Sequence, residues 1–346
     1  EDFRIDFEDG YGNRPDAEED GHAVAAAEEV AKGLAEGTLP PFIGIRIKTF
    51  SNELSLRSAR TLDIFLTTLI RATKGKLPDP FYVTLPKVVH PGQAAALHKL
   101  LNTFEKRKKL KPNTIKVELM IETPQSIIGF DGGAPLRAMV DALPGRCTSA
   151  HFGTYDYTAS CGITAAHQSM DHRSCDFAKH IMQVTLAGTG VNISDGATNV
   201  MPVGPNRPSD GVFNTAEQDR ENAEAVHRAW KLHYGHATGS LVNGFYQGWD
   251  LHPAQLPTRY AAVYAFFLGG LPLATARLKN FMEKAARATL AGDVFDDAAT
   301  GQGLLNYFLR ARNCGAITQD EAAATGLTPA EFASRSFLKI LEGRRR

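Results

Sequence analysis

Residues 81–121 read FYVTLPKVVHPGQAAALHKLLNTFEKRKKLKPNTIKVELMI. Residues 81–89 and 115–121 are short, mostly apolar runs bounded by Pro, Asn and charged residues, which is typical of buried strands. Between them, residues 93–110 carry alanine and leucine at helical spacing, which predicts a helix. A strand, a helix and a second strand in this order indicate a parallel sheet with crossover helices.

The same alternation continues on both sides of this stretch. Further strands are predicted at 3–7, 42–47, 148–155, 191–194 and 241–248, and further helices at 16–34, 56–73, 134–143, 175–186 and 217–234. From residue 256 onward the pattern predicts helices alone. The last of them opens on Thr328-Pro329-Ala330-Glu331, the signature of a capping box.

The arrangement of the sheet follows from what the sequence lacks. Neither of the glycine-rich phosphate loops, GxGxxG or GxxxxGK, occurs in it, so a closed barrel is favoured over an open nucleotide-binding sheet. We expect a TIM (β/α)8 barrel over residues 1–258, with its first strand upstream of the printed sequence, and a helical extension over residues 259–346. In such a barrel the chemistry lies at the carboxyl ends of the strands.

Composition excludes several classes of function. The 346 residues hold 38 Lys and Arg against 38 Asp and Glu, so the formal net charge is zero. This balance argues against binding to nucleic acid or to an anionic membrane through bulk charge. No run approaches the roughly 18 apolar residues of a membrane helix, so no membrane partner is expected. Four cysteines without a CxxC pair predict free thiols in a cytoplasmic protein.

Polar side chains stand where most predicted strands end. Strands in one sheet lie roughly 4.8 Å apart, so acids that end neighbouring strands can meet one ion. Glu122 and Asp156 fit this description, and a site with two carboxylates suits Mg²⁺, or Mn²⁺, which takes its other ligands from water and substrate. The other strand-end residues with chemistry are Glu8, Asp9, Arg46, Lys48, Lys87, Asp195, Asp250 and His252.

These residues lie in motifs that carry a resemblance. In order and approximate spacing, the chain resembles the superfamily of the citrate lyase β-subunit, malyl-CoA lyase and malate synthase, whose barrels are also similar to the HpcH/HpaI aldolases and other phosphoenolpyruvate/pyruvate-type barrels. The motifs are Asp6-Phe7-Glu8-Asp9, Gly44-Ile45-Arg46-Ile47, Leu85-Pro86-Lys87-Val88, Ile121-Glu122-Thr123-Pro124, Phe152-Gly153-Thr154-Tyr155-Asp156-Tyr157 and Leu251-His252-Pro253-Ala254-Gln255.

The resemblance implies a Mg²⁺-dependent carbon–carbon lyase or aldolase acting on a 2-oxo acid or β-hydroxy acid through an enolate. Glu122 and Asp156 would hold the metal, and Arg46 would donate to the oxygen that becomes negative. Thr154 and Tyr155, with Arg46, would bind substrate. No CoA-binding signature is visible, so a CoA thioester is left open as a substrate. A homo-oligomer is expected.

Several assignments stay open in the sequence. The general base is Glu8, Asp9 or His252. Lys87 either forms a Schiff base or pairs with the acids of residues 6–9. His151, two residues before Gly153, is predicted to face the helices. Two other functions also remain: phosphoryl transfer on a phosphoenolpyruvate-like substrate, and a non-catalytic assembly subunit, against which the two converging acids count.

Overall fold

The computed structural model describes residues 2–208, 213–283, 289–291, 294–296 and 298–344. The chain divides into two compact units, which are described separately. The first comprises Glu1–Ala197 with Gln247–Trp249, and the second comprises Thr198–Tyr246 with Asp250–Arg346. The domain division expected from the sequence, 1–258 and 259–346, remains a prediction.

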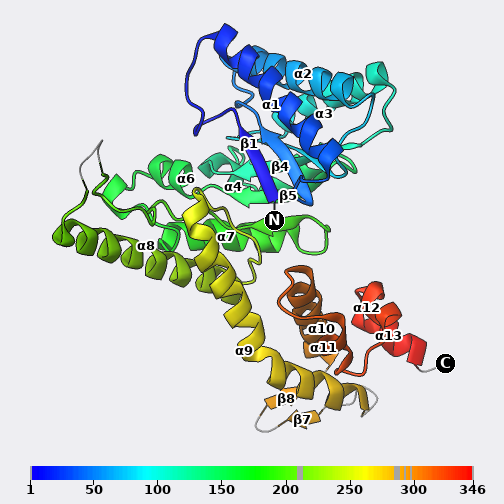
Figure 1. Ribbon diagram of the computed structural model, residues 1–346. Helices are drawn as coiled ribbons and strands as arrows, with labels where there is room; N and C mark the ends of the chain where they lie inside the picture. Colours follow the sequence, from blue (N-terminus) through cyan, green and yellow to red (C-terminus); the bar gives the residue numbers. More distant parts are fainter. Residues whose placement is uncertain (1, 209–212, 284–288, 292–293, 297, 345–346) are drawn as a thin grey trace. The chain divides into compact units, whose positions relative to one another are not determined.

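The first unit is built on a parallel sheet (Figure 1). Its strand order follows the chain, so every strand pairs with its sequence neighbours through a crossover helix. The strands are β1 (Asp2–Asp6), β2 (Phe42–Arg46), β3 (Phe81–Leu85), β4 (Ile115–Ile121), β5 (Cys147–Phe152) and β6 (Asn192–Ser194).

Alternation along the strands separates two faces of the sheet. Ile43 and Ile45 on β2, for example, are buried in the apolar core that also takes in residues of the helices. The intervening residues carry polar groups to the opposite face, where Thr84 donates to Glu118 over 2.9 Å and Ser149 donates to the same carboxylate over 2.8 Å. The face of the sheet away from the helices is therefore polar. The candidate site lies on this face.

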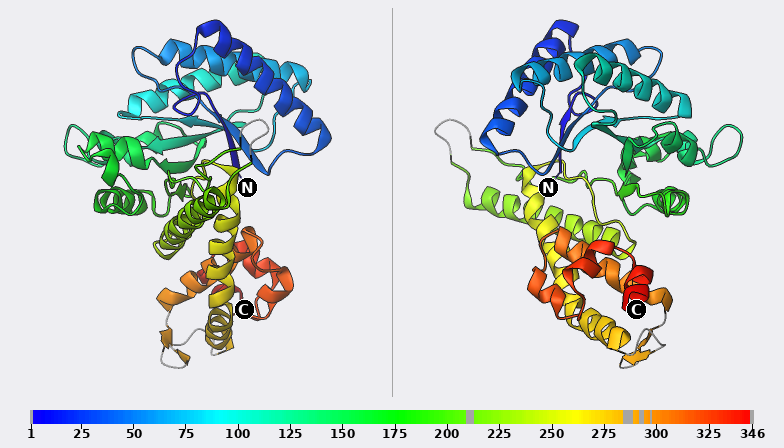
Figure 2. Two further views of the ribbon diagram at one scale, coloured as in Figure 1. Left: turned by 60° about the vertical axis from the view of Figure 1, so that its left-hand side comes forward. Right: turned by 90° about the vertical axis from the view of Figure 1, so that its right-hand side faces the viewer.

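Helices cover the apolar face of the sheet, with α1, α2 and α3 side by side in both views (Figures 1 and 2). The predicted helices of this unit form with ends shifted by a few residues: α1 (Asp16–Glu36), α2 (Ser55–Ala72), α3 (Pro91–Lys108), α5 (Leu136–Asp141) and α7 (Arg173–Leu186). Three short helices were not predicted: α4 (Pro124–Ile127), α6 (Thr154–Ser160) and η1 (Ala165–His167). The predicted strand at 148–155 ends early, at Phe152, because α6 begins at Thr154. The four cysteines are free thiols, as predicted.

The predicted closed TIM barrel is wrong. Within the described residues the parallel sheet has six strands and stays open between β1 and β6. The predicted strand at 241–248 does not form, because α8 (Ala216–Val242) continues through Leu241, whose side chain is buried on that helix. The chain then turns at Gly244, which has a left-handed φ of 85°.

A three-residue segment approaches both edges of this opening. The Asp195 amide donates to the Gln247 carbonyl over 2.9 Å, and Trp249 forms an isolated parallel bridge with Ala197. The Gln247 side chain donates to Asp2 beside β1 over 3.2 Å. These contacts extend β6 by one bridge and reach β1 only through a side chain. In the described part of the chain, no ladder of backbone hydrogen bonds joins β6 to β1.

The second unit is mainly helical, but the prediction of helices alone after residue 256 is wrong, because Thr289–Ala291 and Val294–Asp296 pair as two short antiparallel strands. Buried residues of α9, including Leu278 and Phe281, pack with Phe308, Phe332 and other residues of the following helices, which gather around the lower half of α9 (Figure 2). Thr328 caps its helix in the predicted capping box. The elements after α8 are η2 (Pro253–Gln255), α9 (Leu256–Glu283), β7 (Thr289–Ala291), β8 (Val294–Asp296), α10 (Ala298–Asn313), α11 (Gln319–Ala323), α12 (Pro329–Ser334) and α13 (Phe337–Arg344).

One stretch of this unit, Pro253–Glu283, is long and apolar enough to cross a membrane by length and composition alone. A single helix of this kind is weak evidence, since the core helix of a water-soluble protein meets the same criterion. The expected absence of a membrane partner therefore stays a prediction, as does the cytoplasmic location.

Candidate active site at the carboxyl edge of the sheet

Six of the predicted site residues meet at the carboxyl edge of the sheet in the first unit. Because β1, β2, β3 and β4 are parallel and in register, their ends deliver side chains to one place. Asp156 joins them from the first turn of α6, directly after β5. The five residues brought together with it are Glu8, Asp9, Arg46, Lys87 and Glu122.

Arg46 at the end of β2 is held rigidly by Asp6 at the end of β1. Its guanidinium donates from Nε and Nη2 to the two oxygens of Asp6 over 2.7 and 2.5 Å, a two-point pair with fixed geometry. The remaining nitrogen, Nη1, lies 3.5 Å from Glu8, and the ring of Trp249 lies 5.4 Å from the guanidinium carbon. Arg46 is 9% exposed, so its position is set before any ligand arrives.

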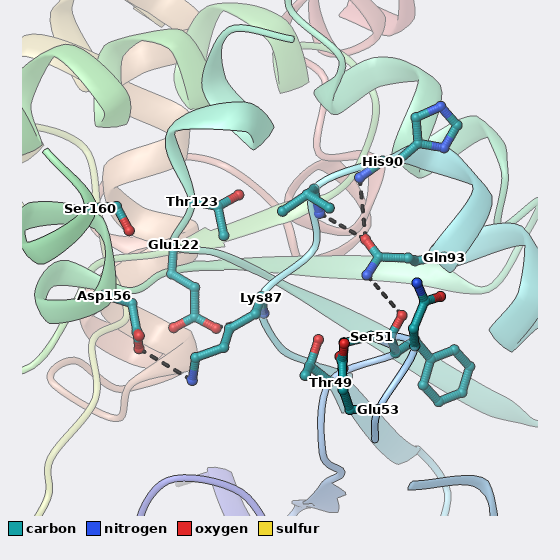
Figure 3. Close-up of a pocket in the computed structure, with 13 residues that line it drawn as sticks. Thr49, Ser51, Glu53, Lys87, His90, Gln93, Glu122, Thr123, Asp156 and Ser160 are labelled. Atoms are coloured by element: carbon teal, nitrogen blue, oxygen red, sulfur yellow. Dashed lines mark hydrogen bonds and ion pairs between the residues drawn. The ribbon is translucent and has the colours of Figure 1, made fainter. Parts of the chain in front are cut away.

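Lys87 lies at the centre of the acids. Its Nζ is 2.5 Å from Glu8 Oε1, 2.6 Å from Asp9 Oδ2 and 3.4 Å from Asp156 Oδ2, and Figure 3 shows the last of these pairs. Burial alone would lower the pKa of this ammonium, but the hydrogen bonds to Asp9 and Glu8 outweigh burial and raise the pKa above its usual range. A protonated amine is no nucleophile, so this environment disfavours the Schiff-base alternative for Lys87 and matches the ion pair.

The backbone of Lys87 also takes part. Its φ is 50°, in the left-handed region that non-glycine residues seldom adopt. In this conformation the Lys87 amide donates to Glu122 Oε1 over 2.7 Å. One residue therefore fixes Glu122 through its main chain and pairs with three other carboxylates through its side chain.

The carboxyl of Glu122 is the most perturbed acid of the cluster. Burial raises its pKa to about 8, the charge of Asp156 adds to this, and Lys87 works against it. Glu122 is 2% exposed, and a Cβ on Gly153 would stand 2.5 Å from its Oε2, so only glycine fits beside this carboxylate. Burial likewise raises the pKa of Glu8. The pKa of Asp9 is lowered, because Lys87 outweighs the opposing effect of burial.

The donor set fits a hard divalent cation with few protein ligands. Two carboxylates, one directly after β4 and fixed by a backbone amide and one partly exposed in the first turn of α6, match Mg²⁺, which keeps several waters. Burial raises the pKa of Glu122 although Lys87 lowers it, so a further positive charge beside this carboxylate would favour its ionised form. In the part of the chain that the structure describes, no group of three or more His, Cys, Asp or Glu side chains could hold a metal ion. A metal here would therefore depend on water or substrate for the rest of its shell.

A cavity of about 660 Å³ opens beside Glu122, Lys87 and Asp156. Its other walls come from the loop after β2, the loop after β3 and the end of α6 (Figure 3). The cavity is large enough for a small organic molecule.

The remaining predicted site residues lie elsewhere. Thr154, at the start of α6, is 2% exposed, and its hydroxyl has no hydrogen-bond partner among the described residues. Tyr155 donates from its hydroxyl to the Ala197 carbonyl over 2.8 Å, a contact that ties α6 to the segment after β6. His252 belongs to the second unit, where its ring accepts from the Ala254 amide over 3.1 Å and caps η2.

The prediction that His151 faces the helices is wrong. Phe152 is buried in the core under the helices, so its neighbour His151 faces the other way, where it stacks on Trp249 with ring centroids 4.1 Å apart. Strand alternation cannot be continued from His151 to Asp156, because β5 ends at Phe152 and α6 begins at Thr154. Asp6 has no separate role in the sequence prediction. The signal for Asp6 was its place at the predicted strand end, in the same motif as Glu8 and Asp9.

The fold and the site together define a class: an α/β protein with an acid-rich cluster, suited to a divalent cation, at the carboxyl ends of parallel strands. The chain belongs to the family described as "Domain of unknown function (DUF6986)", whose model matches residues 1–340. A search among curated proteins gave no match.

Solved structures share the fold. The chain is similar to a citrate lyase from Burkholderia xenovorans LB400, with 20% identity, a TM-score of 0.66, and 94% of this chain and 87% of that chain covered. It is also similar to malate synthase from Haloferax volcanii. One structure of that enzyme, at 3 mM glyoxylate, shows 14% identity and a TM-score of 0.54, with 96% of this chain and 86% of that chain covered. Its magnesium/glyoxylate complex shows 14% identity and a TM-score of 0.53, with 96% of this chain and 87% of that chain covered.

Proposed function

We propose that the protein is a Mg²⁺-dependent carbon–carbon lyase or aldolase that acts on a 2-oxo acid or its β-hydroxy product through an enolate. The observation that carries this proposal is the pair of Glu122, directly after β4, and Asp156, in the first turn of α6 after β5, beside a rigidly held arginine. The fold likeness to citrate lyase and malate synthase supports it.

Glu122 and Asp156 are the residues that would hold the metal. When bound, Mg²⁺ supplies positive charge beside the carbonyl and carboxylate oxygens of the substrate. Arg46 adds a second fixed positive charge, because Asp6 orients it and Trp249 shields it. Such preorganised charge stabilises the negative oxygen that develops when a proton leaves the carbon beside the carbonyl.

Glu8 is the proposed proton acceptor. Burial raises its pKa, which is the direction that a base working near neutral pH requires. Asp9, whose pKa is lowered, stays ionised and keeps Lys87 in place. The ring of the alternative base, His252, accepts a hydrogen bond from the Ala254 amide. A role of His252 as the base stays a prediction, as does substrate binding by Thr154 and Tyr155.

The test is deuterium exchange at the methyl group of pyruvate in D₂O, followed by NMR. We expect exchange with Mg²⁺, and its loss both in EDTA and in Glu122→Gln. Glu28→Gln, the same change on an exposed position of α1, is the matched control. Exchange that survives EDTA would contradict the metal, and borohydride trapping of pyruvate on Lys87 would establish the Schiff base instead. Absence of exchange with any 2-oxo acid would overturn the function.

A further inference from the structure

The cavity beside the acid cluster has a distal part that the proposed chemistry at Glu122 and Asp156 does not use. This distal wall, formed by Thr49, Phe50, Ser51, Asn52 and Glu53, comes from the loop after β2. Each member except Phe50 carries a hydroxyl, amide or carboxylate. The composition of the distal wall therefore bears on what the second substrate can be.

The distal wall is built on fixed loops. The Gln93 side chain accepts from the Val89 amide over 2.8 Å and donates to the Phe50 carbonyl over 3.0 Å, so it ties the loop after β3 to the loop after β2 (Figure 3). Thr123 donates to the Val88 carbonyl over 2.8 Å and ties in the end of β4. These amide and hydroxyl groups are hydrogen-bonded to the main chain of the loops, so the cavity is formed before a ligand binds.

Thr49 and Asn52 on the distal wall have no protein partner. Among the described residues, no side chain or main-chain group is hydrogen-bonded to the side chain of either. Asn52 is exposed to water, whereas Thr49 is 9% exposed and lines the cavity. A hydroxyl at such a position favours a ligand with a hydroxyl group of its own.

The charge of the cavity restricts the ligand further. Among the described residues that line it, Lys87 is the one lysine or arginine, and it is already paired with Glu8, Asp9 and Asp156. Glu53 adds an acid at the distal wall. A second substrate with phosphates or a carboxylate would find no free cation there and would be repelled.

We propose that the distal wall receives the electrophile, and that this electrophile is an uncharged hydroxyaldehyde, which is neither a CoA thioester nor a charged aldehyde. This proposal rests on the proposed function. In the synthetic direction the oxo acid loses a proton from its methyl carbon, and that carbon forms a bond to the aldehyde carbon. The carbonyl π bond of the aldehyde breaks and its oxygen gains a proton, so protons and electrons balance without a further reactant.

The first experiment compares electrophiles at fixed pyruvate and Mg²⁺, with product formation followed by NMR. The probes are glycolaldehyde and glyceraldehyde, which are neutral and hydroxylated, and glyoxylate, succinic semialdehyde and acetyl-CoA, which are anionic. We expect kcat/KM for glyceraldehyde to exceed that for each anionic probe by at least about ten-fold. A preference for glyoxylate, succinic semialdehyde or acetyl-CoA would overturn the proposal.

Deuterium exchange into pyruvate separates this inference from the proposed function. Exchange together with the wrong electrophile preference would sink the inference and leave the function standing. Absence of both exchange and product would sink the function itself.

A second experiment addresses the hydroxyl of Thr49. Thr49→Val removes it at constant shape, and we expect KM for glyceraldehyde to rise about three- to ten-fold, with a smaller change in KM for pyruvate. Thr49→Ser, which restores a hydroxyl, should recover most of the loss. Thr103→Val on the exposed face of α3 is the matched control. Equal effects on both KM values, or no effect on either, would contradict a role in electrophile recognition.

Discussion

Two charged clusters lie at opposite edges of the same sheet, and they are built differently. At the amino edge, before β5, the fully buried Arg146 donates two bonds of 2.8 Å to Glu105 and a third, of 2.6 Å, to the Ile115 carbonyl. The Ile115 and Asn113 amides complete the shell of Glu105. Every charge in this cluster is matched.

The cluster at the carboxyl edge is not matched. There, the two cations Arg46 and Lys87 interact with five carboxylates. The carboxylates are those of Asp6, Glu8, Asp9, Glu122 and Asp156. Removal of one partner of a balanced buried pair leaves an uncompensated charge and destabilises the fold, whereas an excess of carboxylates beside a cavity favours binding of a cation from outside. The comparison distinguishes a structural cluster from a functional one within a single sheet.

Breaking the balanced cluster should have the largest effect, and the effect should be on folding. Arg146→Met leaves the Glu105 carboxylate buried without its partner, so we expect the free energy of unfolding to fall by about 3–5 kcal/mol. Urea denaturation followed by circular dichroism measures this. If the soluble fraction of the variant unfolds at the same urea concentration as the native protein, the matched pair is not structural.

Changing the unbalanced cluster should affect activity rather than folding. Arg46→Lys keeps the charge but loses the two-point pair with Asp6, so we expect the rate of pyruvate exchange to fall about 10²- to 10³-fold. The urea midpoint should change little. A variant with native exchange rates would remove Arg46 from the proposed chemistry.

The pH dependence of stability should also differ between the clusters. Because the folded protein raises the pKa of Glu122 to about 8 from an ordinary value near 4.5, the folded state keeps a proton that the unfolded chain has lost. In EDTA, the contribution of Glu122 to stability therefore falls as pH rises from about 4.5 to about 8. Glu122→Gln, which mimics the protonated form, should melt a few degrees above the native protein at pH 8.5 and close to it at pH 5. If the difference in melting temperature between Glu122→Gln and the native protein is the same at pH 5 and pH 8.5, the raised pKa of Glu122 is contradicted.

The smallest expected effect concerns the backbone of Lys87. Both Lys87→Gly and Lys87→Ala remove the ammonium, but only glycine adopts the left-handed φ of 50° without strain. We expect the glycine variant to be more stable than the alanine variant by about 0.5–1 kcal/mol in urea denaturation. An alanine variant of equal or greater stability would show that the conformation at Lys87 stores no strain.

Much of this sheet could be predicted from the sequence, because apolar residues at alternate strand positions specify the core directly. Ile115–Ile121, for example, is a strand over the predicted residues. The predicted strand at 241–248 failed because Leu241 and Val242 suit a strand or a helix, and the packing of α8 decided between them. Closure of the sheet is a long-range property, which no local pattern contains.

The candidate site was predicted in part for the same reason. Strand ends in a parallel sheet converge, so Glu8, Arg46, Lys87, Glu122 and Asp156 could be placed together from their positions alone. The two-point pair of Asp6 with Arg46 depends on the register between β1 and β2. The hydrogen bond from the Lys87 amide to Glu122 depends on a left-handed φ at Lys87, which a lysine in the sequence does not predict. Such details arise only when the strands are assembled.

The segment Gln247–Trp249 has a consequence for how the chain is made. Each ladder of the parallel sheet joins strands that are neighbours in sequence, so the sheet can grow strand by strand as the amino-terminal part leaves the ribosome. Trp249, which stacks on His151 and lies against Arg46, arrives some fifty residues after β6. The polar face of the sheet is therefore left without this cover during synthesis, and the surroundings of Arg46 are completed late.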